Sequence, residues 1–281
     1  MTFLVIGAAG AQGGAVARRL VAEGHTVRGL TRSGRVPHGV EPVAGDLGDA
    51  GAVKAAFAGV THAAVTLPLV YEPDTVAAYI HHVRDSALAA GVRRLVFNTA
   101  NRLPEATTQV AAFETRRWAV RTLQSAGLPV VVLCPPVYLD NLAASWVAGP
   151  LAAEGVLRYP LPADLPVPWL SHDDLGAATH AALVRDDLEG AMLKLGGPDV
   201  VTGDELAAAF GARYSAQDLA EFESGLAMAL GAPLAAVVAA TYRWAAADRD
   251  LFAADPAVAD LLGLRLTPLR AWIAARPWAT R

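Results

Sequence analysis

Short runs of Val, Ile and Leu alternate with amphipathic stretches along the first half of the chain. Strands are predicted at residues 2–6, 26–31, 42–44, 61–66, 94–98 and 129–134. Helices are predicted between them, at residues 11–23, 50–58, 74–90 and 108–126. Strands that alternate with helices in this way form βαβ units with right-handed crossovers. The pattern therefore predicts an α/β fold with a doubly wound parallel sheet of the Rossmann type.

The second half of the chain is less regular and mostly helical after residue 202. Further strands are predicted at residues 156–159, 167–170 and 191–195, and a helix from Asp173 to just before Gly190. Shorter helices are predicted at residues 207–210, 219–230, 233–247 and 258–262. We expect residues 1–140 to form a dinucleotide-binding core and residues 141–281 a smaller substrate-binding part that is continuous with it.

The Ala-rich helices of residues 224–247 allow two interpretations. In the first, the segment of about residues 202–250 is a helical lid that closes over a substrate. In the second, these helices form a dimer surface. Small residues allow the close helix packing that either interpretation needs. The chain is accordingly expected to be a monomer or a homodimer.

A glycine motif follows the first predicted strand and opens the first predicted helix, as Gly7-Ala8-Ala9-Gly10-Ala11-Gln12-Gly13. Gly7 permits a tight turn, Gly10 lets the backbone approach a pyrophosphate, and Gly13 lets helix and strand pack closely. The helix N-terminus offers free N–H groups to the phosphates. This context predicts dinucleotide binding, with Ala9 and Gln12 in the same loop as contacts. The alternative is a tight turn without a ligand.

The segment after the second predicted strand indicates which dinucleotide is bound. An NAD site has an acidic residue there for the ribose 2′-OH, whereas this chain has Arg32, Ser33 and Arg35. Arginine presents a planar fork that suits a 2′-phosphate, so the cofactor is predicted to be NADP(H), unless Arg32 is only a solvated loop residue. After the third strand, Asp46 and Leu47 are predicted to hold the adenine. Asp46 could also cap the next helix.

Composition excludes several classes of protein. With 54% hydrophobic and 18% charged residues, the chain is too apolar for a disordered protein. A net charge of −4 without a Lys/Arg cluster argues against nucleic-acid binding. The single cysteine, Cys134, excludes a disulfide framework and a cysteine-based metal cluster. The uncharged residues 224–242 are mostly Ala with a Gly-Ala-Pro break, so we expect no membrane span, no metal and a cytoplasmic protein.

These motifs resemble the NmrA-like group of atypical short-chain dehydrogenases/reductases. The resemblance covers roughly residues 1–200 and is carried by the glycine motif, Arg32, and residues 45–47, 67–68, 125–128, 135–141 and 167–176. The group includes NADPH-dependent quinone and ketone reductases, isoflavone-reductase-type enzymes and dinucleotide-sensing regulators. The resemblance implies NADP(H) contacts at the ends of the central strands, from Thr66, Leu67, Pro68 and Asn98.

The chain departs from the family at the catalytic pair. Short-chain reductases use Tyr-x-x-x-Lys, and the corresponding positions here fall near Ala112 and Arg116. Arg116 is expected to hold the nicotinamide ribose in place of the lysine, but arginine cannot give up a proton at neutral pH. The substrate could need no acid, as for a quinone, or the protein could perform no chemistry. Otherwise a relocated donor is needed, and the candidates are Thr99, Tyr138, His172 and Tyr71.

Substrates of this fold lie outside the carboxyl ends of the strands. The segments expected there contribute Tyr71, Tyr138, Asn141 and Trp169, with Trp146 and Trp118 as further candidates. Such an aromatic lining suits a flat polycyclic ligand, although aromatic residues are also common in cores. His172 precedes Asp173 and Asp174 at a predicted helix start, so a capping role competes with catalysis there.

The leading hypothesis is an NADPH-dependent reductase that acts without a Tyr–Lys pair. Its predicted substrate is a quinone or a polycyclic aromatic, polyketide-like ketone, in antibiotic biosynthesis. The first alternative is a dinucleotide-sensing regulator without turnover, which the missing tyrosine also favours. The others are a general quinone reductase and an isomerase or cyclase. Steady consumption of NADPH would argue against the regulator and the isomerase.

Overall fold

The computed structural model describes residues 1–276 and 278, and in these residues seven strands form one parallel sheet. The strands are β1 (Thr2–Ile6), β2 (Thr26–Thr31), β3 (Val40–Ala44), β4 (His62–Thr66), β5 (Arg94–Asn98), β6 (Val130–Cys134) and β8 (Met192–Lys194). Their order is β3-β2-β1-β4-β5-β6-β8, and every neighbouring pair is parallel. The predicted doubly wound parallel sheet is therefore confirmed.

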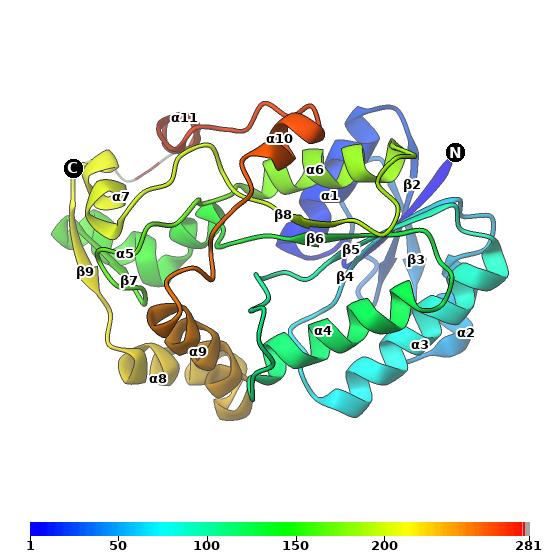
Figure 1. Cartoon of the computed structure of the whole chain (residues 1–281), viewed down its shortest axis with the longest axis horizontal. Coiled ribbons are helices and arrows are strands. Elements are labelled where there is room, and N and C mark those ends of the chain that lie inside the picture. The colour runs from blue at the N-terminus through cyan, green and yellow to red at the C-terminus, as the bar shows by residue number, and fades with distance from the viewer. Residues whose placement is uncertain (277, 279–281) are drawn as a thin grey trace.

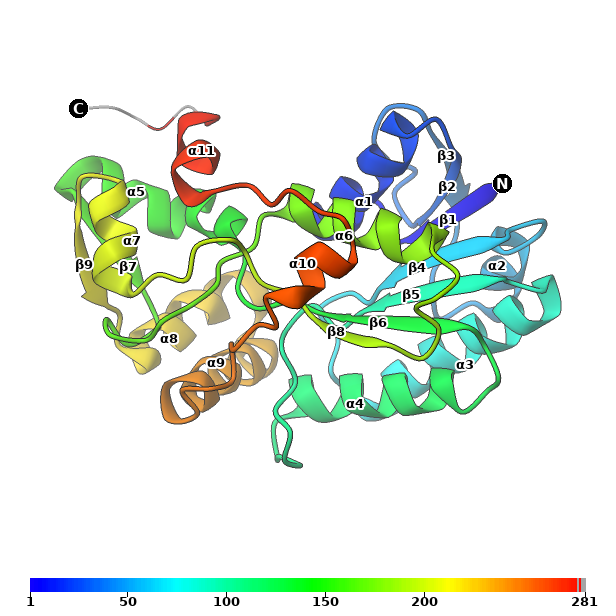
Figure 2. The same cartoon turned by 45° about the horizontal axis from the view of Figure 1, so that its top comes forward.

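Helices cover both faces of this sheet (Figures 1 and 2). One face carries α2 (Ala50–Ala56), α3 (Pro73–Ala90) and α4 (Ala111–Gln124), and the other carries α1 (Ala11–Ala22) and α6 (His172–Val184). Alternate residues of each strand serve the two layers: Leu4 packs toward α2 and α3, and Phe3 packs toward α1 and α6. Burial on both faces explains why the strands β1 and β6 are apolar except at Thr2.

The helices α1 and α6 lie in close contact because small residues line their interface. A Cβ added to Gly176 would lie 2.9 Å from the backbone oxygen of Ala15. This contact holds the start of α6 beside the start of α1, where the glycine motif lies. α6 and β8 both come after residue 140 and pack against or pair with the large sheet, so the chain returns to the sheet after residue 140; the division at that residue stays a prediction.

A smaller part lies beyond the carboxyl ends of the strands (Figure 1). It contains η1 (Leu139–Ala143), α5 (Ser145–Glu154), β7 (Val156–Tyr159), α7 (Gly203–Ala209), β9 (Arg213–Ala216), α8 (Leu219–Leu230), α9 (Ala232–Ala247) and α11 (Leu269–Ala274). α10 (Ala257–Leu261) returns to the large domain, where Val258 is buried. β7 and β9 pair in parallel, and Trp272 is buried in the core beside them.

The sequence missed α5, β9 and α11, and it predicted one strand that does not form. Residues 167–170 make only isolated bridges, between Val167 and Val201 and between Tyr138 and Leu170. The apolar run of residues 167–170 is therefore buried as loop rather than as a strand. Several ends also differ: α4 begins at Ala111 rather than residue 108, and α6 begins at His172.

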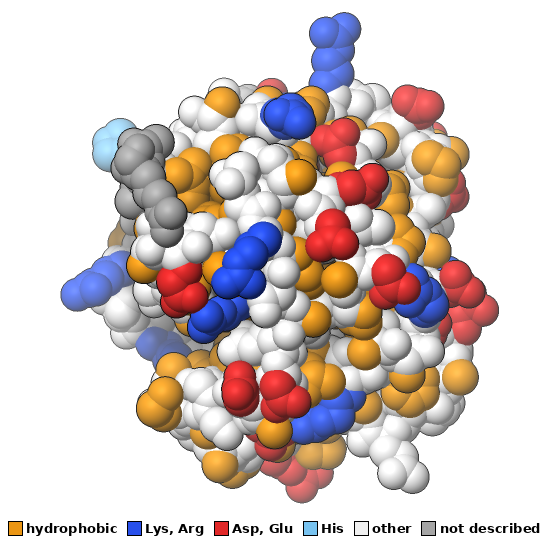
Figure 3. Space-filling view, turned by 90° about the vertical axis from the view of Figure 1, so that its left-hand side faces the viewer, with side chains coloured by type: hydrophobic (Ala, Val, Ile, Leu, Met, Phe, Trp, Pro, Cys, Tyr) orange, Lys and Arg blue, Asp and Glu red, His pale blue; other side chains and the backbone are white. Residues whose placement is uncertain are grey.

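None of the described helices combines the length and the apolar character needed to cross a bilayer. In the same residues, no group of three or more His, Cys, Asp or Glu side chains is placed to hold a metal ion. On the face that Figure 3 shows, acidic and basic side chains are scattered among apolar ones and do not gather into a basic patch.

Candidate active site

The glycine motif forms a tight turn between β1 and α1 that leaves its backbone accessible. Gly7 has a φ of +87°, and its carbonyl accepts from the Gly10 N–H at 2.9 Å. A Cβ on Gly13 would lie 2.2 Å from that same carbonyl oxygen, so this position excludes every other residue. Gly10 precedes α1 without a side-chain cap. The first N–H groups of α1 are therefore left for an anion.

The loops after β2 and β3 place a cation and hydroxyl groups beside this turn. The Arg32 side chain is 80% exposed, with Nε 3.6 Å from Asp46 Oδ2. The hydroxyls of Thr31 and Ser33 lie 3.3 Å apart. No acidic residue occupies residues 31–35. A 2′-phosphate would therefore meet no carboxylate from the end of β2, although it would compete with Asp46 for Arg32.

The two predicted adenine residues have different surroundings. Asp46 Oδ1 accepts from the Gly48 N–H at 2.7 Å, and the cap of α2 is Asp49, whose side chain accepts from Gly51 and Ala52. The capping alternative for Asp46 is thus wrong. Leu47 is buried in the core, so its side chain anchors the loop between β3 and α2.

Four predicted residues meet above the glycine turn. The Asn98 side chain donates to Gln12 Oε1 at 2.8 Å and to Thr66 Oγ1 at 3.3 Å. The Tyr138 hydroxyl donates to the same Gln12 oxygen at 3.2 Å. These side chains come from α1, β4, β5 and the segment after β6, and they form a polar floor where the carboxyl ends of the strands meet the turn.

Thr99 does not face this floor. Its hydroxyl is fully buried and lies within hydrogen-bond distance of the carbonyls of Asn101 and Leu133. The structure gives the predicted catalytic role of Thr99 no support, because its proton is used to hold the chain after β5. The next residue, Ala100, has a φ of +63°, a left-handed conformation that costs free energy in a residue other than glycine.

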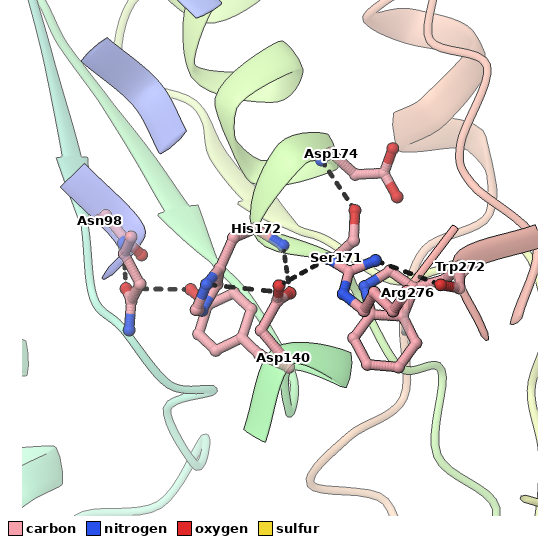
Figure 4. A network of polar contacts seen from close by, with 9 residues as sticks. Asn98, Asp140, Ser171, His172, Asp174, Trp272 and Arg276 are labelled. Atoms are coloured by element: carbon pink, nitrogen blue, oxygen red, sulfur yellow. Dashed lines mark hydrogen bonds and ion pairs between the residues drawn. The ribbon is translucent and has the colours of Figure 1, made fainter. Parts of the chain in front are cut away.

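His172 lies at the start of α6 in a polar network (Figure 4). Its backbone N–H donates to Asp140 Oδ2 at 2.7 Å, and Arg276 donates to Asp140 Oδ1 at 3.0 Å. Ser171 caps α6, since its hydroxyl oxygen accepts from the backbone N–H of Asp174, so the capping alternative for His172 is wrong. The His172 ring packs edge-on against Tyr138, with centroids 4.6 Å apart. Burial lowers the pKa of His172, although the charge of Asp140 opposes this effect.

Arg116 is buried below the loop that follows β4. Its terminal nitrogens donate to the carbonyl of Pro68 at 2.9 Å and to that of Val70 at 3.0 Å. Arg116 therefore holds this loop against α4, and its expected role at the nicotinamide ribose stays a prediction. Leu67 is buried in the core and Pro68 is exposed.

A cavity of about 270 Å³ opens beside the polar floor. It is lined by four of the five predicted substrate residues, Tyr71, Tyr138, Asn141 and Trp146. Gln12 also lines it, so the glycine turn and the cavity share one residue. Trp169 is instead buried in the core against Tyr159, and Trp118 packs against His81 on α3. Aromatic character alone could not separate lining residues from core residues.

The sequence missed the lining that α8 and α9 contribute. Phe222 and Leu226 come from α8, and Val238, Thr241 and Tyr242 come from α9. Both helices carry apolar residues on more than one face, so periodicity did not show which residues line a cavity. The lid remains a prediction, now with named residues at the cavity.

A buried cation lines the cavity, and no carboxylate among the described residues forms an ion pair with it. Arg102 is buried, and it donates to the carbonyls of Cys134 and Leu195 at 2.8 and 2.6 Å. Its Nε has no partner among the described residues. Burial lowers the pKa of Arg102 to about 10, so the side chain remains charged at neutral pH. A ligand that gains negative charge here would be stabilised by it.

A second cavity, of about 590 Å³, lies between α6, the loop after β8 and the segment before α10. It is lined mainly by Pro, Gly, Ala and Leu residues, and Phe252 separates it from the smaller cavity. None of the residues of the glycine motif lines it. The smaller cavity is therefore the candidate active site.

Residues 1–220 match the NmrA-like family. The chain belongs to this family, within the atypical short-chain dehydrogenases/reductases that its motifs resemble.

One sequence relative and two solved structures that are similar to this chain are named as reductases or oxidoreductases. An NAD(P)H azoreductase from Xenophilus azovorans is 29% identical over 221 residues, which cover 74% of this chain and 72% of that protein. The structure of the Citrobacter sp. triphenylmethane reductase complexed with NADP(H) has a TM-score of 0.80 at 19% identity, over 98% of this chain and 99% of that chain. An NADPH-dependent quinone oxidoreductase from Escherichia coli, complexed with NADPH, has a TM-score of 0.78 at 21% identity, with the same coverage.

Proposed function

We propose that this protein is an NADPH-dependent reductase that transfers a hydride to a compact aromatic acceptor, a quinone or an azo compound. The observation that carries the proposal is the position of Gln12. This residue lies in the first turn of α1, directly after the glycine turn, and also lines the aromatic cavity. A dinucleotide bound at the turn would thus reach the cavity directly. The names of the azoreductase and quinone oxidoreductase relatives support the same reaction class.

The residues present fit NADPH. A Cβ would block the turn at Gly7 and Gly13, and the exposed Arg32 side chain would supply the cation that a 2′-phosphate needs. When bound, the nicotinamide supplies the hydride. The protein's part is to hold the acceptor flat beside the polar floor, to exclude water with the aromatic lining, and to stabilise the negative charge that develops through the Arg102 guanidinium.

The size of the cavity bears on the substrate. A cavity of about 150 Å³ holds one benzene molecule, and this cavity of about 270 Å³ suits one or two fused rings. This favours a simple quinone or naphthoquinone over a four-ring polyketide. A tailoring role in antibiotic biosynthesis therefore remains a prediction that needs movement of α8 and α9 to admit a larger substrate.

The test is NADPH oxidation at 340 nm with a panel of acceptors. The panel contains 2-hydroxy-1,4-naphthoquinone, a hydroxylated anthraquinone, an azo dye and an isolated aryl ketone. Oxidation with the naphthoquinone and the azo dye, but not with the ketone, is the expected result. No oxidation with any acceptor, together with tight NADPH binding, would contradict the proposal and favour a dinucleotide-sensing regulator.

A further inference from the structure

Three polar side chains form a chain of hydrogen bonds that ends at the cavity. The Asn141 amide donates to the Tyr159 hydroxyl at 3.1 Å, and that oxygen lies 2.9 Å from the Tyr242 hydroxyl. Tyr159, the last residue of β7, is fully buried in the core of the smaller part. Tyr242 belongs to α9 and lines the cavity, as does Asn141. The three residues thus connect the cavity wall to the core.

The partners fix the direction of the protons. A tyrosine hydroxyl donates one hydrogen bond, and a buried one needs an acceptor. Asn141 uses its N–H toward Tyr159, so the Tyr242 oxygen is the acceptor that remains for the Tyr159 proton among the described residues. The proton of Tyr242 therefore points away from Tyr159, toward the cavity. This arrangement prepares Tyr242 to donate to a ligand.

The other tyrosines of the cavity are less suited to this task. The Tyr138 proton is directed onto Gln12. Tyr71 lies below the Arg116 guanidinium, but no described residue hydrogen-bonds its hydroxyl. Among the described residues, the Tyr159 hydroxyl donates to the Tyr242 oxygen, the atom that would become negative after proton release. A hydrogen bond to the charged form favours that form, which offsets part of the burial that raises the pKa of Tyr242 to about 12.

We propose that Tyr242 delivers the proton that accompanies hydride transfer, an inference that rests on the proposed reductase function. The hydride from NADPH adds two electrons and one hydrogen to the acceptor. The Tyr242 O–H bond breaks, and its proton goes to the oxygen of a quinone or to the second nitrogen of an azo bond. The products are NADP⁺ and a hydroquinone or a hydrazo compound. Tyr159 stabilises the Tyr242 phenolate through its hydrogen bond.

The phenolate regains its proton from solvent after the product leaves. Trp146 lines the cavity and is 38% exposed, so the cavity opens to water on that side. Tyr242 also lies beyond residue 220, where the match to the family ends. The proton donor would thus come from the helical hairpin of α8 and α9, a part of the chain that the family match does not reach.

The test compares four variants with the same chemical change, Tyr242→Phe, Tyr159→Phe, Tyr71→Phe and Tyr214→Phe. Tyr214 is the matched control, because its hydroxyl donates to the backbone carbonyls of Tyr159 and Leu161 and it does not line the cavity. Steady-state rates with 2-hydroxy-1,4-naphthoquinone give kcat and KM. Titration of each variant, loaded with NADP⁺, with the same naphthoquinone gives its dissociation constant without turnover.

Tyr242→Phe is expected to lower kcat by about 100-fold or more, the range for loss of a positioned acid, with a smaller change in KM. Its dissociation constant for the naphthoquinone should rise by roughly threefold to tenfold, as for one lost hydrogen bond. Tyr159→Phe should lower kcat by a smaller factor, and Tyr214→Phe should leave it unchanged. Tyr71→Phe should lower kcat by less than Tyr242→Phe does.

A kcat within threefold of wild type in a folded Tyr242→Phe protein, with unchanged naphthoquinone affinity, would overturn the assignment of Tyr242 and leave the reductase function intact. A larger loss in Tyr71→Phe than in Tyr242→Phe would also overturn it. A wild-type protein that oxidises no NADPH with any acceptor would instead overturn the proposed function itself.

Discussion

The guanidinium of Arg116 lies 4.8 Å from the centre of the Tyr71 ring, and its two terminal nitrogens hold the carbonyls of Pro68 and Val70. A buried arginine on α4 thereby fixes the loop after β4, and this loop places Tyr71 in the cavity wall. A cation over an aromatic face is stabilising, more so where water is excluded. The position that resembles the family's lysine thus supports the substrate side of the site.

Replacing Arg116 tests this support. Arg116→Met leaves two carbonyl groups without donors and removes the contact with Tyr71. We expect the free energy of unfolding to fall by about 2 to 3 kcal/mol, and the affinity for 2-hydroxy-1,4-naphthoquinone to fall with it. Urea denaturation and ligand titration measure the two effects. Arg121→Met, at an exposed position of the same helix, is the control and should change neither quantity.

The glycine turn predicts different results at two of its positions. A Cβ at Gly13 would lie 2.2 Å from the Gly7 carbonyl, whereas a Cβ at Gly10 would lie 3.4 Å from it. Gly13→Ala should therefore lower the melting temperature, and Gly10→Ala should keep it while weakening NADPH binding. Calorimetry and fluorescence titration measure the two properties. Equal melting temperatures for the two variants would contradict the close packing of Gly13.

Arg32 is predicted to select NADPH over NADH. Its side chain is exposed, and the one ion pair it makes among the described residues is with the Asp46 carboxylate, so Arg32→Ala should not disturb the fold. Loss of a charge-assisted contact to the 2′-phosphate should weaken NADPH binding by about tenfold or more. NADH lacks this phosphate and serves as the control ligand. Equal weakening for both dinucleotides would show that Arg32 does not contact the 2′-phosphate.

Stability is predicted to decrease at acidic pH because of His62. Burial lowers the pKa of His62 from 6.5 to about 4, and the charges of Arg93 and Arg94 act in the same direction. Between pH 4 and 6.5 the unfolded chain binds more protons at His62 than the folded chain does. The contribution of His62 to the free energy of unfolding is therefore fully present above pH 6.5 and is lost as the pH falls toward 4. The loss from this residue is at most about 3 kcal/mol.

His62→Gln should remove that part of the pH dependence, measured by urea denaturation between pH 4 and 7. His38→Gln is the matched control at an exposed position and should retain it. If the free energy of unfolding of His62→Gln depends on pH as steeply as that of the wild type, the acid sensitivity belongs to other groups. Candidates are His172 and His180, whose pKa values are also lowered by burial.

The fold was predictable from sequence where a local pattern determines it. The spacing of Gly7, Gly10 and Gly13 is recognisable because a tight turn between strand and helix has no room for larger side chains. The parallel strands are recognisable as apolar runs because both faces of the sheet are buried. α5 was missed because it contains Pro150 and has small or apolar residues on every side. β9 was missed because its residues, Arg213–Ala216, are half exposed and carry no apolar alternation.

The candidate site was predictable only in part. The residues near the strand ends, such as Asn98 and Tyr138, follow from topology, since the carboxyl ends of parallel strands meet. Tyr242 and Phe222 reach the cavity only because α8 and α9 fold back over the strand ends, a tertiary relationship without a local signal. The contacts of Arg116 with the loop after β4 were not predicted, because spacing gives its place on α4 but not the direction of its side chain.

Hydride transfer from NADPH is the central claim, and isotopic labelling tests it most directly. NADPH carrying deuterium at the 4R or the 4S position of the nicotinamide is incubated with the protein and 2-hydroxy-1,4-naphthoquinone, and the NADP⁺ formed is analysed by mass spectrometry. Because a protein site fixes one face of the ring, one labelled form should give NADP⁺ without deuterium and the other should retain all of it. NADP⁺ formation no faster than without protein, or a mixture of labels from both forms, would contradict enzymatic hydride transfer.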